Sequence, residues 1–154
     1  MQTDGSPATG QSAARDKLSA LLTKLLNTVP GTNRALLAAG DGLKLAWTEQ
    51  PDADADAFAA AVVGLYSLGR QVFKDNPLGG IRQIIVEHDG GHLFVMSAGV
   101  DFTHANAVNT VLAVKAAPDA DAGQVGYEMD AFIRGLDEHL VVEARPNAFS
   151  GPGL

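Results

Sequence analysis

The feature that most constrains this chain is a stretch near its middle that has helical spacing but lacks charge. Asp54 and Asp56 open the stretch, and every residue from Ala57 to Gly69 is apolar, small or uncharged. Solvent-facing helix positions are usually filled by Glu, Lys, Gln or Arg, and a helix that is apolar all round is buried all round. The sequence therefore predicts a helix over Asp54–Lys74 that is covered on more than one side.

Three strips of this helix predict three different neighbours. The larger residues are expected to face the sheet of the same chain: Phe58, Ala61, Val62, Leu65, Leu68, Gly69 and Val72. A second strip of small and uncharged residues is the predicted dimer interface: Ala60, Gly64, Ser67 and Gln71. The alternative is that residues 99–109 of the same chain cover that second strip.

The third strip is the predicted partner-binding surface: Ala59, Val63, Tyr66 and Arg70. Tyr and Arg are among the residues most often found at interface hot spots, and a two-fold dimer would present the strip twice. The alternative is that Tyr66 packs on its own subunit while Arg70 is solvated.

The rest of the chain alternates helical and strand-like segments. Turn sequences rich in Asp and Gly join the strands in pairs, which favours hairpins and an antiparallel sheet with helices on its faces. We therefore expect an α+β fold made of helix Leu18–Val29, strands Arg34–Ala39 and Leu43–Thr48, the middle helix, strands Ile81–His88, His92–Ala98 and Thr110–Ala116, and helix Asp121–Leu140.

Composition limits both the architecture and the partners. The Gly-, Pro- and Ser-rich ends predict disordered tails over 1–12 and 145–154, with a single domain over 13–144. The net charge of −7, with 11 basic and 18 acidic residues, disfavours a nucleic-acid partner. The sequence has no cysteine, signal-like start or long apolar run, so we expect a cytoplasmic protein without membrane insertion.

No motif predicts catalysis, a cofactor or a metal. Phosphate-binding and nucleophile-elbow patterns are missing, and the acidic start of the middle helix departs from a calcium loop at Ala57 and Val63. His88 and His92 flank a turn, but two imidazoles without a third ligand do not make a specific site. The chain is therefore not expected to be an enzyme.

Several segments together resemble the bacterial roadblock (dynein light-chain) family. They are Val29-Pro30-Gly31, Ala35–Leu43, Gly64–Arg70, Ile81–Glu87, Gly90–Met96 and Gly123–Met129, and the resemblance extends over Leu18–Leu140. It implies an α-β-β-α-β-β-β-α order with the middle helix on one face of a five-stranded antiparallel sheet and the terminal helices on the other. It also implies a homodimer that pairs the middle helices and joins the sheets at the third strand.

The resemblance carries a functional expectation as well. The most similar members are encoded in bacterial conservon-type clusters, beside a Ras-like GTPase and a sensor-kinase-like protein. The implied function is a regulatory adaptor that binds a small Ras-like GTPase in signal transduction and modulates its nucleotide state. The segment Gly99–Asn109 departs from the family by its length. The alternative function is a small-ligand sensor of PAS or GAF type, which needs an enclosed pocket with convergent polar groups.

Overall fold

The computed structural model describes residues 6–98 and 110–149, with side chains described over 12–98 and 110–136. The segment 99–109 lies outside the described residues, and with it the expectation that this segment covers the middle helix. Within the described residues, no helix is both long and apolar enough to cross a membrane.

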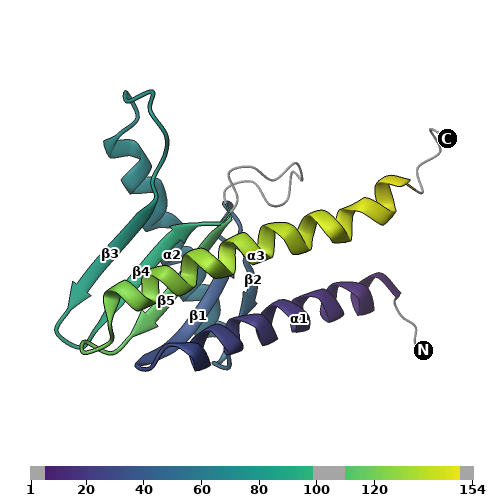
Figure 1. Cartoon of the computed structure of the whole chain (residues 1–154), viewed down its shortest axis with the longest axis horizontal. Helices are drawn as coiled ribbons and strands as arrows, with labels where there is room; N and C mark the ends of the chain where they lie inside the picture. The colour runs from purple at the N-terminus through teal and green to yellow at the C-terminus, as the bar shows by residue number, and fades with distance from the viewer. Residues whose placement is uncertain (1–5, 99–109, 150–154) are drawn as a thin grey trace.

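Three helices sandwich one sheet. Helix α1 (Ser6–Thr28) and helix α3 (Ala122–Phe149) lie side by side on one face, and α2 (Asp52–Val72) lies on the other (Figure 1). This arrangement confirms the expected layers. The outer helices extend further than predicted. Residues 6–12 and 145–149, which the sequence placed in the tails, belong to α1 and α3. Pro7 fits the first turn of α1, where its missing N–H has no helical acceptor in any case.

The sheet has five antiparallel strands in the order β2-β1-β5-β4-β3. The two predicted hairpins are confirmed, and the fifth strand lies between them. Both outermost strands, β2 and β3, belong to hairpins. The bounds are β1 Thr32–Ala38, β2 Lys44–Trp47, β3 Gln83–His88, β4 Gly91–Ser97 and β5 Val111–Ala116.

Two hydrophobic cores lie on opposite faces of the sheet, because successive side chains of a strand point to opposite sides. On β1, Leu36 packs towards α2 and Leu37 packs towards α1 and α3. Phe94 lies with Leu37, whereas its neighbour Val95 lies with Leu36. The three central strands are therefore covered on both sides, which explains their nearly continuous apolar sequence.

The turn at the first hairpin follows from its sequence. Gly42 has a φ of 92°, which favours glycine, and its N–H donates to the carbonyl of Ala39 at 2.9 Å. Asp41 accepts from the N–H of Leu43 through its side chain at 3.1 Å. The turn leaves the side chain of Leu43 65% exposed.

Candidate interaction surface

Helix α2 contacts the sheet through smaller residues than predicted. Its buried face consists of Ala55, Ala59, Val62 and Tyr66, which follow each other at helical spacing. Ala55 and Ala59 are fully buried, so their small side chains let the first half of the helix approach the sheet closely. The helix is therefore rotated about its axis relative to the prediction, in which Leu68 and Val72 faced the sheet.

This rotation corrects the predicted partner-binding surface. Ala59 is fully buried and Tyr66 is 7% exposed, both in the core between α2 and the sheet. Val63 is half-buried against the same core, and Arg70 alone of the four is exposed. These residues do not form an exposed strip, and the alternative for Tyr66, packing on its own subunit, is correct.

The predicted dimer residues lie on the outer face of α2, which points away from the sheet. Ala60, Gly64, Ser67 and Gln71 are all exposed, and a Cβ built on Gly64 would meet no atom within 4 Å. Their exposure leaves an uncharged strip facing solvent in a chain of net charge −7. Coverage of this strip by a second subunit stays a prediction.

One flank of α2 faces the β3 side of the sheet, and its apolar residues are exposed. A Cβ on Gly69 would lie 3.1 Å from Ile84 Cδ1 of β3. The opposite flank faces β2, because Asp56 Oδ1 lies 2.6 Å from Lys44 Nζ. Helical spacing puts Leu68 and Val72 on the same flank as Gly69, and they are 67% and 75% exposed.

Strand β3 continues this exposed apolar surface. It lies at the edge of the sheet, where Val86 shares the α2 face with Ile84 and is 39% exposed, whereas Ile85 is 43% exposed on the opposite face. We define the α2–β3 seam as the exposed or half-buried apolar residues of the flank and of the α2 face of the strand: Ala61, Leu65, Leu68, Val72 and Val86. The residue pattern of the middle helix did not single out this surface, although the family resemblance implied a junction at the third strand. Three consecutive apolar residues, Ile84-Ile85-Val86, also indicate a strand covered on both faces.

The other edge of the sheet is partly closed by the protein itself. The backbone N–H of Trp47 on β2 donates to Ser19 Oγ of α1 at 3.3 Å. The indole ring of Trp47 contacts two cations, Arg15 of α1 at 5.3 Å and Lys44 at 4.7 Å from the ring centroid. An edge strand whose N–H and side chain are engaged in this way is a poor template for another strand. The two edges therefore differ, and β3 is the more available one.

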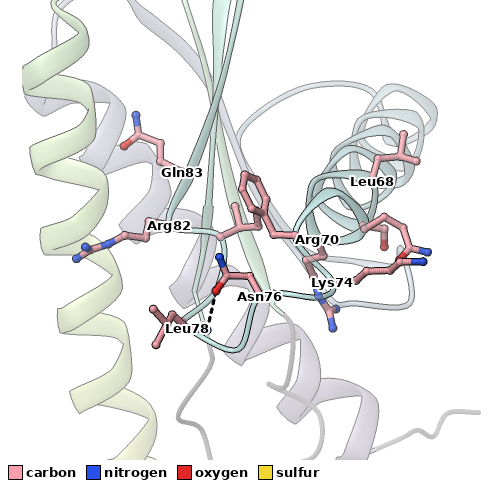
Figure 2. Close-up of a pocket in the computed structure, with 13 residues that line it drawn as sticks. Leu68, Arg70, Lys74, Asn76, Leu78, Arg82 and Gln83 are labelled. Atoms are coloured by element: carbon pink, nitrogen blue, oxygen red, sulfur yellow. Dashed lines mark hydrogen bonds between the residues drawn. The ribbon is translucent and has the colours of Figure 1, made fainter.

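A pocket of about 980 Å³ opens at the end of α2, between the helix and the start of β3 (Figure 2). Arg70, Lys74 and Arg82 line it, but Figure 2 shows their side chains pointing in different directions. The loop beside them is held by the Asn76 side chain, which accepts from the N–H of Leu78 at 2.9 Å. The polar groups do not converge on a single point, unlike those of a small-ligand site.

Potential metal ligands are a further feature of the part of the chain that the structure describes. Within those residues, no three His, Asp or Glu side chains group as potential metal ligands. The Nδ1 atom of His88 accepts from the N–H of Gly90 at 2.9 Å, which is a turn contact.

Comparison with known proteins agrees with this architecture. The family model described as Roadblock/LC7 domain matches residues 18–125. A solved Roadblock/LC7 domain from Streptomyces avermitilis is 36% identical, with a TM-score of 0.70, and the match covers 80% of this chain and 97% of that one. Among curated protein sequences, none matches this chain.

More distant structures share the fold. MglB from Myxococcus xanthus is 17% identical with a TM-score of 0.66, over 82% of this chain and 96% of that one. The gliding protein MglB from Thermus thermophilus is 18% identical with a TM-score of 0.65, over 88% of this chain and 92% of that one.

Proposed function

Because the chain belongs to the Roadblock/LC7 family, we propose that it is a bacterial regulatory adaptor without a catalytic centre of its own. It homodimerises through the α2–β3 seam and binds a small Ras-like GTPase in the cytoplasm as part of a signalling system. A sensor-kinase-like protein is a further candidate partner. The observation that carries the proposal is the seam itself, an exposed apolar helix flank beside an open strand edge.

The seam has the properties of a surface that needs a partner. Leu68 and Val72 are mostly exposed, and large exposed apolar patches on monomers usually mark contacts. Burying one such side chain stabilises an assembly by about 1.5–3 kcal/mol, and two-fold symmetry makes each contribution count twice. Backbone pairing of two β3 edges would also satisfy the hydrogen-bonding groups that the edge exposes. A second copy of the chain fits both needs at once.

Self-association is tested by replacing one apolar residue in the seam and one outside it. Leu68→Lys should weaken the dimer by at least about tenfold, which corresponds to about 1.4 kcal/mol. Leu43→Lys is the matched control, because Leu43 is 65% exposed, Leu68 is 67% exposed, and Leu43 lies at the opposite side of the sheet. Sedimentation equilibrium measures both. A monomeric wild-type protein, or equal effects of the two changes, would refute the proposed interface.

The GTPase is proposed to dock on the outer face of α2. In a dimer joined at the seam, the strip formed by Ala60, Gly64, Ser67 and Gln71 stays open and is presented twice, once by each subunit. Its small side chains allow a partner backbone to come close, and Arg70 beside it offers a charged anchor of the kind found at hot spots. The partner class itself comes from the family resemblance, not from this surface.

Docking is tested with the small Ras-like GTPases of the source organism, loaded with GDP or with a GTP analogue. Ser67→Arg should reduce binding by at least about tenfold while the dimer persists, because the added side chain blocks close approach. Thr23→Arg, at an exposed position of α1, is the control. A parallel assay of GTP hydrolysis shows whether binding alters turnover. Unchanged binding of Ser67→Arg in an intact dimer would exclude this face.

A further inference from the structure

The edge of β3 carries charges of opposite sign at its two ends. Arg82 immediately precedes the strand, and Glu87 and Asp89 lie at its end and in the turn that follows. Arg82, Glu87 and Asp89 are all exposed. Within the described residues, neither Arg82 nor Glu87 takes part in an ion pair. In the single chain, an unpaired cation therefore stands at one end of the open edge and an unpaired anion at the other.

The backbone geometry of β3 determines which residues can meet across a two-fold axis. His88 and Gly91 flank a two-residue turn, so His88, Val86 and Ile84 direct their hydrogen-bonding groups to β4. The groups of Gln83, Ile85 and Glu87 then face the open edge. Antiparallel pairing of two such edges with Ile85 on the axis places Gln83 opposite the partner's Glu87. A shift of this register by one residue would lose the hydrogen bonds.

Arg82 and Glu87 also share a face of the sheet. A Cβ on Gly126 of α3 would lie 3.4 Å from Gln83 Oε1, so Gln83 points to the α3 face. Glu87 points the same way because it lies four positions later on the strand. Figure 2 shows the side chain of Arg82 reaching away from α2, on the same side as Gln83. An axis perpendicular to the sheet preserves this face in the second subunit.

We propose that ion pairs between Arg82 and the partner's Glu87, formed twice across the two-fold axis, set the register of the β3–β3 junction. This inference rests on the proposed dimer, since it assigns the residues that align the two copies. Opposite charges across neighbouring strands stabilise a pairing, and like charges oppose it. A slipped register would separate these charges and is disfavoured.

The charges of α2 support the same antiparallel arrangement. The helix begins with exposed Asp52 and Asp54 and ends beside exposed Arg70 and Lys74, with Asp75 offsetting one of those positive charges. An antiparallel pair of α2 helices brings the negative start of one near the positive end of the other. A parallel pair would bring like charges together.

Charge exchange at the junction tests the inference. Arg82→Glu and Glu87→Arg should each raise the dimer dissociation constant by about tenfold, because each introduces two like-charge contacts. The double variant R82E/E87R should return to within about threefold of wild type, since the pairs re-form with reversed sign. Lys24→Glu, on the exposed surface of α1, is the control for the change in net charge.

Sedimentation equilibrium gives the dissociation constants, and circular dichroism verifies folding. If a reversed variant fails to fold, Arg82→Gln and Glu87→Gln replace it and should weaken the dimer less. A wild-type dimer whose single variants match Lys24→Glu, or whose double variant is not restored, overturns the ion-pair assignment while the dimer stands. A monomeric wild-type protein overturns both the assignment and the proposed dimer.

Discussion

Truncating Tyr66 and Leu68 in turn tests the rotation of α2, because these neighbours lie on different sides of the same helix. Tyr66 is 7% exposed, so Tyr66→Ala empties a site in the core between α2 and the sheet. Loss of a buried aromatic side chain destabilises by about 3–5 kcal/mol. Leu68 is 67% exposed. Because only about a third of its side chain is buried in the monomer, Leu68→Ala should remove about 0.5–1 kcal/mol of the free energy that burying a whole leucine side chain contributes.

Urea denaturation at two protein concentrations separates these effects. At a concentration low enough to dissociate subunits, Tyr66→Ala should lower the free energy of unfolding by about 3 kcal/mol or more, and Leu68→Ala by about 1 kcal/mol at most. At high concentration the loss for Leu68→Ala should grow, because association stabilises the folded state by mass action. Equal losses at low concentration would mean that the helix does not have the rotation described here.

Two further predictions concern the sheet. A Cβ on Gly91 would lie 2.8 Å from the carbonyl oxygen of Ala116, so Gly91→Ala should lower stability by about 1–3 kcal/mol in thermal unfolding. Gly64→Ala is the matched control on helix α2, where a Cβ meets open space, and should raise stability by about 0.5–1 kcal/mol. A neutral Gly91→Ala would contradict the close approach. The buried Thr48 hydroxyl accepts from the N–H of Ala35 at 3.0 Å, so Thr48→Val should cost about 1–3 kcal/mol in the same assay, and no loss would mean that the N–H finds another acceptor.

The number, type and order of the elements were predictable because local signals determine them. Asp41-Gly42 supports a tight turn whatever the tertiary context, and alternating helical and strand periods leave few arrangements for a single sheet. The helix ends were less predictable. The Gly- and Pro-containing sequence around Pro146 predicts an end of structure, yet α3 extends to Phe149.

The surface was harder to predict than the fold, since the middle helix has apolar or small residues on every side. Periodicity gives the spacing of a stripe but not which stripe meets the sheet when several qualify. Larger residues suggested Leu68 and Val72, whereas the structure uses Ala55 and Ala59, whose small side chains permit close packing. The choice depends on the shape of the sheet surface, which residue spacing does not encode.

The strand order has a consequence for how the chain assembles during synthesis. Strands β1 and β2 form one hairpin and β3 and β4 form another, and within the sheet β5 alone joins the two. Strand β5 (Val111–Ala116) follows both hairpins along the chain. A nascent chain on the ribosome that does not yet include β5 therefore has two hairpins whose inner edges, on β1 and β4, are open. The unpaired backbone groups of such edges can pair with those of a neighbouring nascent chain. Emergence of β5 closes both edges at once, so completion of the sheet is a single late event.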